Sequence, residues 1–150
     1  MESPDTMENL EQSITALQKA LEEHTLERSP VDYAVAQTSL GEAYRRLAEY
    51  KEEPWRCLRK SIVAYKEALK VYTLNQFRVE YARTMGSLAV SYGELAWVGT
   101  RMDPCLLARK CIHEALDILT EKEFPQEHQK FQKVLERIEE IYDRVRWELM

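Results

Sequence analysis

A chain of 150 residues is long enough for one domain with a buried core, and its net charge of −5 disfavours a duplex nucleic-acid binder that relies on overall charge. Its 45% apolar residues exclude a disordered chain, while only four glycines and five prolines oppose a β-sandwich and suit long helices with short loops. The acidity lies near the start, because residues 1–32 carry a net charge of −6, which leaves +1 for the remainder.

Cysteine usage and hydropathy indicate the compartment. Cys57, Cys105 and Cys111 form no CxxC pair, which is typical of reduced thiols in a cytosolic protein. The first residues are acidic and lack an apolar core, so no secretory signal is predicted. No stretch approaches the roughly 20 apolar residues that span a bilayer. We therefore expect a soluble, cytoplasmic protein that binds neither membranes nor nucleic acid.

Prolines mark the starts of the expected helices. A serine or aspartate before proline can cap the N-terminus of a helix with its side chain. The proline then takes the first helical position, where its missing N–H costs no hydrogen bond. All five prolines are interpreted as helix starts and Asn75 as one further cap; the prolines are Pro4, Pro30, Pro54, Pro104 and Pro125. The expected helices, with apolar residues at three- and four-residue spacing, are 5–24, 30–51, 54–73, 76–98, 104–120 and 125–148. Joined by short turns, they form three antiparallel pairs.

An internal repeat runs through the chain. The segment Ile14-Thr-Ala-Leu-Gln-Lys-Ala-Leu returns as Ile62-Val-Ala-Tyr-Lys-Glu-Ala-Leu, a shift of 48 residues. In the same register Thr25 corresponds to Thr73, and a weaker third copy places Thr120 at a further shift of 47. A helix-pair repeat of this period predicts a solenoid, because no unit buries its own apolar faces without a stacked neighbour.

The repeat resembles the tetratricopeptide repeats. That family has a large residue, Leu-Gly and Tyr on the first helix, then a small residue, an aromatic and Ala on the second. The first match is Gln37-x-x-Leu40-Gly41-x-x-Tyr44 with Ser61-x-x-x-Tyr65-x-x-Ala68. The second is Met85-x-x-Leu88-Ala89-x-x-Tyr92 with Ala108-x-x-x-Ile112-x-x-Ala115. We expect Gly41 and Ala89 to let the helices of Ala68 and Ala115 approach closely.

The resemblance implies an all-α fold, a right-handed superhelix of three antiparallel helical hairpins with six helices in a single domain over 1–150. An orphan helix over 5–25 precedes repeat units 30–73 and 77–120, and the capping helix 125–148 follows. The period of 47–48 residues exceeds the family's usual one of about 34, so the helices are longer. The family's signature Trp and terminal Pro are missing, and Thr25, Thr73 and Thr120 stand in the proline positions. In the last helix Glu136 and Glu139 replace the small and aromatic residues, which forbids a further unit from stacking there.

Motifs for catalysis are not found. The chain has no phosphate-binding glycine loop, no HExxH and no nucleophile elbow. Cys105, Cys111 and His113 suggest zinc, but six helical residues turn through about 600°, which puts the two cysteines on different faces. We therefore expect no enzyme activity, no cofactor and no metal, with the cysteines as packing residues. Trp55 and Trp97 lie near hairpin turns and are candidates for partly exposed anchors.

In tetratricopeptide-like stacks the first helix of each pair lines a concave surface, and the resemblance implies that this surface holds the ligand. Among the non-core positions of these helices, six basic residues outnumber three acidic ones. The predicted groove residues are Val35, Thr38, Glu42, Arg45, Arg46, Arg83, Val90, Glu94, Lys130, Lys133 and Arg137. The competing interpretation is an ordinary charged helix surface.

The predicted function is a protein-interaction adaptor or scaffold that binds a peptide segment of a partner, acidic in character, in this groove. The alternative is homodimerisation through the terminal helices. On that hypothesis Leu10, Ile14, Leu17 and Leu21 of the first helix are only half-buried. The last helix has a second apolar stripe at Val134 and Ile141.

Overall fold

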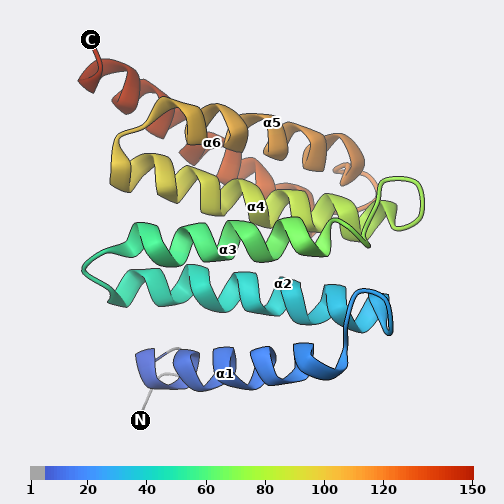
Figure 1. Ribbon diagram of the computed structural model, residues 1–150. Helices are drawn as coiled ribbons and strands as arrows, with labels where there is room; N and C mark the ends of the chain where they lie inside the picture. Colours follow the sequence, from blue (N-terminus) through green and yellow to red (C-terminus); the bar gives the residue numbers. More distant parts are fainter. Residues whose placement is uncertain (1–5) are drawn as a thin grey trace. The chain divides into compact units, whose positions relative to one another are not determined.

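The computed structural model describes residues 6–150, and within that range it contains helices and no strand, which confirms the all-α prediction (Figure 1). The described residues fall into two compact units, which we call the N-terminal unit, ending at Val71, and the C-terminal unit, beginning at Tyr72. This boundary lies close to the predicted junction between the two repeats. The helices are α1 (Met7–Glu23), α2 (Pro30–Leu47), the 3-10 turn η1 (Ala48–Tyr50), α3 (Pro54–Ala68), α4 (Arg78–Gly99), α5 (Met102–Ile118) and α6 (Pro125–Glu148).

Proline marks the helix starts at three of the predicted positions. Helices α2, α3 and α6 each begin with the predicted proline at their first turn. The prediction for α5 was wrong, because this helix begins at Met102, with Pro104 inside its first turn, where an N–H has no intrahelical partner to lose. Asn75 is not a cap, since Phe77 occupies that position before α4. Pro4 lies outside the described residues.

The turns that precede α2, α4 and α6 share one hydrogen-bonded geometry. In each, a threonine carbonyl accepts from the backbone N–H four residues later, at 3.0 Å for Thr25, 2.9 Å for Thr73 and 2.8 Å for Thr120. In each, the threonine hydroxyl oxygen also accepts from the N–H three residues later, at 3.2 to 3.4 Å. Threonine therefore closes the turn where the tetratricopeptide pattern has proline, and the predicted shifts of 48 and 47 residues are present in the backbone.

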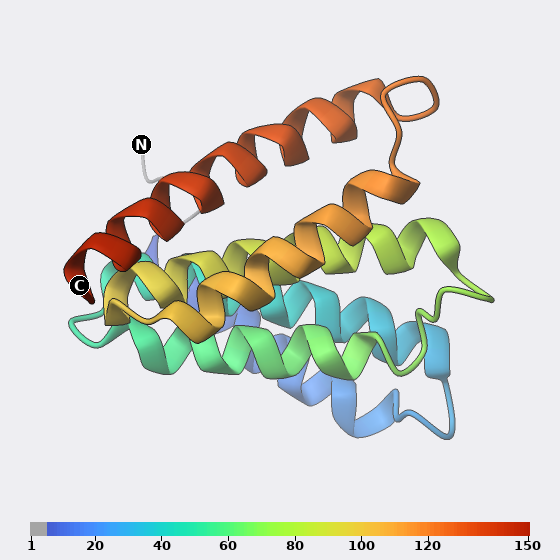
Figure 2. The same ribbon diagram turned by 90° about the horizontal axis from the view of Figure 1, so that it is seen from above.

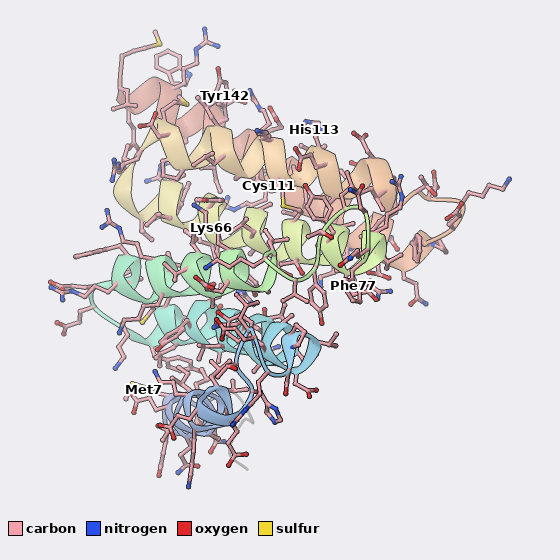
Figure 3. The ribbon with its side chains drawn as sticks, turned by 45° about the vertical axis from the view of Figure 1, so that its right-hand side comes forward. Met7, Lys66, Phe77, Cys111, His113 and Tyr142 are labelled. Carbon is pink, nitrogen blue, oxygen red and sulfur yellow. The ribbon has the colours of Figure 1, made fainter. Side chains whose placement is uncertain are left out.

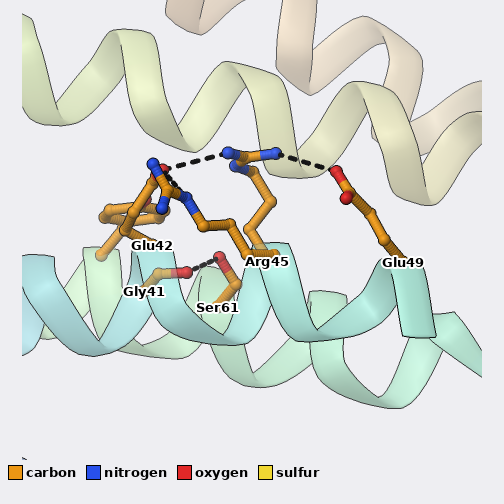
Figure 4. Close-up of polar contacts among 7 residues, drawn as sticks. Gly41, Glu42, Arg45, Glu49 and Ser61 are labelled. Carbon is orange, nitrogen blue, oxygen red and sulfur yellow. Dashed lines mark hydrogen bonds and ion pairs between the residues drawn. The ribbon is translucent and has the colours of Figure 1, made fainter. Parts of the chain in front are cut away.

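In the N-terminal unit, α2 packs against α1 and against α3 (Figure 1). A Cβ at Gly41 would lie 2.7–2.9 Å from three atoms of the Tyr65 ring, so glycine is required for this approach. The Ser61 hydroxyl donates to the Gly41 carbonyl at 2.7 Å (Figure 4). The predicted close approach at Gly41 is confirmed, and it occurs at Tyr65 and Ser61 of the helix that contains Ala68.

The apolar side chains of helix α1 are more deeply buried than expected. Leu10 and Ile14 are buried on α2, so the prediction that they are half-buried was wrong, while Leu17 and Leu21 are half-buried as predicted.

In the C-terminal unit, α6 packs on both α4 and α5 (Figure 2). Gly86 lies against the Phe131 ring, and Ala89 and Ala115 are fully buried. The residues that carry the tetratricopeptide resemblance are buried in both hairpins; they are Gln37, Leu40, Gly41, Tyr44, Ser61, Tyr65, Ala68, Met85, Leu88, Ala89, Tyr92, Ala108, Ile112 and Ala115.

Each hairpin is tied by an equivalent hydrogen bond. Tyr33 of α2 donates its hydroxyl to Glu67 of α3 at 2.6 Å, and Tyr81 of α4 donates to Glu114 of α5 at 2.8 Å. Burial, followed by the bond to Glu114, raises the pKa of Tyr81 to about 12, so the phenol remains a donor at any physiological pH. Over residues 6–150, no helix has the length and apolarity needed to cross a bilayer.

Candidate partner-binding surfaces

The predicted groove residues come from both units. Helix α2 of the N-terminal unit carries five of them, and α4 and α6 of the C-terminal unit carry six. In the C-terminal unit the structure brings four together around one cleft, namely Val90, Glu94, Lys133 and Arg137. The α2 residues form a separate set, described next.

On α2, acidic and basic groove residues pair with each other. One oxygen of Glu42 accepts from Arg45 at 3.0 Å and from Arg46 at 2.9 Å, and Arg45 also lies 4.0 Å from Glu49 (Figure 4). Burial alone raises the pKa of Glu42, but the hydrogen bonds and charges of the two arginines outweigh it and bring the pKa below its usual value. The positive charge predicted for α2 is thus balanced within the helix.

Two further groove residues lie on the outer side of α2. Val35 is 50% exposed, and the Thr38 hydroxyl donates to the Val35 carbonyl at 2.9 Å.

The basic groove residues of α4 and α6 differ in whether they have acidic partners. Arg83 forms two bonds to Glu127, at 2.6 and 2.8 Å, and Arg137 lies 3.3 Å from Glu140. The bonds from Arg83 hold the pKa of the Glu127 carboxyl below its usual value. Lys133 has no acidic partner among residues 6–150, whereas the charge of Lys130 also lowers the pKa of Glu127, and the Lys130 ammonium lies 5.4 Å from the centre of the Phe131 ring. Lys133 is therefore the uncompensated charge among the predicted bases that the structure describes in this unit.

The cleft between α4 and α6 has a volume of about 210 Å³ and an almost entirely apolar lining. Its room comes from Gly93, where an added Cβ would lie 3.5 Å from Ile138 and 3.8 Å from Ile141. The rim carries Lys133 and Arg137. The lining residues are Ala89, Val90, Gly93, Glu94, Lys133, Val134, Arg137, Ile138 and Ile141.

Both predicted tryptophan anchors are accessible, and both are covered by arginine. Trp55 is 40% exposed, with Arg59 at 5.3 Å from its ring centre. Trp97 is half-buried beneath Arg137 at 4.6 Å and Arg144 at 3.6 Å. The rim arginine of the cleft is therefore held in place by stacking as well as by its ion pair.

Sequence reasoning missed the most basic helix, α3. It carries a net charge of +3, from Arg56, Arg59, Lys60 and Lys66 against Glu67, whereas each of the other five α-helices has a net charge of zero or below. All four bases are exposed. Summing the charges of every expected helix, rather than of the first helix of each pair alone, reveals this feature. Beside these bases, a groove in the N-terminal unit is lined by Gln18, Gln37, Leu40, Tyr44, Arg59, Lys60, Val63, Ala64 and Glu67.

The thiols are packing residues of the two units. Cys111 is buried while His113 is exposed on the same helix, α5 (Figure 3). Cys105 is fully buried, its sulfur lies 3.8 Å from the Ile138 carbonyl, and burial raises its pKa, which disfavours the thiolate that binds metals. Within 6–150, no three His, Cys, Asp or Glu side chains are placed to hold a metal ion.

Comparison of the chain with protein-family models, curated proteins and solved structures finds no match in any of the three.

Proposed function

We propose that this protein is an interaction adaptor whose C-terminal unit binds a short segment of a partner protein in the cleft between α4 and α6. The observation that carries the proposal is an apolar cleft with Lys133, a base lacking an acidic partner within 6–150, on its rim. At about 210 Å³ the cleft is smaller than the roughly 300–1,000 Å³ typical of small-molecule sites, so it suits one or two anchoring side chains.

The chemistry of the cleft suggests the chemistry of its ligand. An aliphatic side chain placed against Val134, Ile138 and Ile141 gains about 1.5–3 kcal/mol from burial. An acidic residue beside it pairs with Lys133 in an exposed contact that contributes only about 0–1 kcal/mol. Affinity therefore depends on the apolar anchor, and the charges mainly accelerate association and select acidic partners.

We further propose that the units stack as the right-handed superhelix that the tetratricopeptide resemblance implies, which would add the α2 groove residues to the binding surface. The equivalent bonds of Tyr33 and Tyr81 support this proposal, as do the three identical threonine turns, because stacked repeats share their internal geometry. The three buried cysteines, none of which is in a disulfide bond, suit a cytoplasmic location.

A peptide-selection experiment tests the cleft. Random dodecapeptides displayed on phage are selected on the full chain and on the variant Val90→Glu, which places a carboxylate in the half-buried lining. The matched control is Val98→Glu on the same helix, where the side chain is 43% exposed and outside the cleft. The proposal expects peptides with aliphatic and acidic residues that bind the wild type and Val98→Glu but not Val90→Glu. Equal binding to all three proteins would rule out the cleft.

Self-association is the second candidate function, and the exposed apolar side chains at and beyond the end of α6 favour it. Trp147 is 77% exposed, Leu149 60% and Met150 85%, which is unusual for large hydrophobic residues so close together. On this alternative, sedimentation equilibrium gives a dimer mass that reverts to the monomer in Trp147→Glu. A monomer at all concentrations would eliminate it.

A further inference from the structure

We propose that the groove over α2, between α1 and α3, is a second docking site that binds an acidic segment of a partner protein. This site lies wholly within the N-terminal unit, and it is independent of the cleft between α4 and α6.

The charge of the groove comes from two residues of α3. Arg56 pairs with Glu53 at 2.6 Å and Lys51 pairs with Glu11 at 3.0 Å, so these two bases are compensated. Arg59 and Lys60 have no acidic partner among residues 6–150. They lie instead against the Trp55 and Tyr44 rings, at 5.3 and 5.5 Å from the ring centres. Aromatic contact orients a cation without neutralising it, so both charges remain available to a ligand.

Below these charges the groove offers apolar surface. Leu40 and Ala64 are buried in its floor, and Val63 is 59% exposed on its wall. The Gln18 side chain of α1 donates to the Tyr44 hydroxyl at 3.1 Å on the opposite side of the groove. A bound segment thus meets apolar contacts and two positive charges together.

The ends of the groove differ, which gives the ligand a direction. Glu67 lies at the end away from Arg59 and accepts bonds from Tyr33 at 2.6 Å and Lys70 at 2.8 Å. From Lys60 to Glu67 the helix rises about 10 Å, which matches roughly three extended residues. The segment that fits has acidic residues near Arg59 and Lys60, aliphatic residues over Val63, and no acid at the Glu67 end.

A protein segment suits this groove better than a phosphate-rich surface. Helix α1, which borders the groove, has a net charge of −3, from Glu8, Glu11, Glu22 and Glu23 against Lys19, and would repel a membrane or duplex broad enough to cover both helices. A narrow segment meets only the basic wall. The exposed Val63 also matches an aliphatic side chain, which phosphate groups do not supply.

The test is an NMR titration of the full chain, labelled with nitrogen-15, with the peptide Asp-Glu-Asp-Leu-Leu-Ser-Lys. We expect amide shifts at Leu40, Arg59 and Val63, and a Kd that rises about tenfold when the acids of the peptide become Asn and Gln. Arg59→Glu combined with Lys60→Glu should weaken binding of the acidic peptide by at least the same factor. The matched control, Lys110→Glu with Lys122→Glu, changes the net charge equally at exposed residues of the other unit and should bind normally.

Several results would overturn the proposal. One is the absence of amide shifts in the groove at millimolar peptide. A second is equal weakening of peptide binding in both charge-reversed variants. A third is preferential binding of phosphatidylserine vesicles or duplex DNA through Arg59 and Lys60. A dimer that dissociates when these two residues are reversed would show that a second copy occupies the groove, and would equally overturn it. Val90→Glu should not affect this titration, which separates failure here from failure of the cleft between α4 and α6.

Discussion

Replacing Gly41 with alanine tests the packing of α2 on α3 directly. The added Cβ would lie 2.7–2.9 Å from the Tyr65 ring, well inside the about 3.5–4.0 Å of a normal carbon contact. Tyr65 is only 2% exposed, so its ring has no solvent to move into. Either the ring or the whole of α3 must shift, and a shift of α3 stretches the 2.7 Å bond from Ser61 to the Gly41 carbonyl.

The opposing contributions to the free energy of unfolding predict that Gly41→Ala is destabilising. Alanine is favoured over glycine in a helix by about 1 kcal/mol. Overpacking costs about 1–3 kcal/mol, and loss of the Ser61 bond costs about 1 kcal/mol more. The net destabilisation of Gly41→Ala is therefore about 1–3 kcal/mol, and Gly41→Leu or Ala89→Leu should lose more, since their added volume is larger.

Urea unfolding followed by circular dichroism measures the effect, and Gly93→Ala is the matched control. Its Cβ would lie 3.5 Å from Ile138, an ordinary contact, so this variant should be neutral or stabilised by up to about 1 kcal/mol. Gly41→Ala should cost less in a Tyr65→Leu background than in the wild type, because the smaller side chain makes room for the added Cβ. The reasoning fails if Gly41→Ala is as stable as the wild type, or if the two glycine variants shift together.

Four other expectations concern hydrogen bonding, acid stability, metal and charge. Tyr81→Phe should lower the free energy of unfolding by about 1 kcal/mol, measured by urea unfolding, because Glu114 loses its donor. The pKa of Glu42 in the folded protein is below its ordinary value of 4.5, so the stability that its carboxylate contributes is present above 4.5 and is lost as the pH falls through the folded pKa. The free energy of unfolding, measured between neutral and acid pH, should therefore fall less steeply in Glu42→Gln. EDTA should leave the helical signal and melting curve unchanged, whereas a loss restored by zinc would return the cysteines to metal ligation. Lys133→Glu should slow association of a selected cleft peptide in stopped-flow measurements and flatten its salt dependence, and Lys110→Glu, an exposed base on another helix, should do neither.

Local sequence signals predict the start of a helix well where that start depends on the backbone chemistry of proline. Proline at the first position fixed the starts of α2, α3 and α6, and repeat spacing identified the contact at Gly41. The start of α5 was missed because the first helical turn accepts proline at more than one position. The burial of Leu10 was missed because one side of α1 packs on α2, a property of the tertiary contact and not of the amphipathic pattern.

The candidate site was predicted only in part, and the reason is electrostatic. Counting bases along the first helix of each pair takes no account of acidic side chains on other helices. The ion pair of Arg83 with Glu127, 44 residues away in sequence, could therefore not be predicted in this way. The lining residues Val134 and Ile141 belong to the second apolar stripe that the sequence predicts for the last helix. Their place in a cleft depends on the missing side chain of Gly93 on another helix.

The two hairpins share their internal hydrogen bonds but differ in the chemistry of their exposed surfaces. The threonine turns and the tyrosine bonds are formed within each copy, so the internal geometry of each hairpin depends on its own residues. Exposed side chains that take no part in these hydrogen bonds can differ in residue type between the two hairpins. Arg59 and Lys60 of α3 correspond, at the shift of 47, to Leu106 and Leu107 of α5, which are 46% and 44% exposed. The two hairpins thus present a cationic face and an aliphatic face on similar interiors, so a surface of this repeat can change its recognition chemistry without a change in its core.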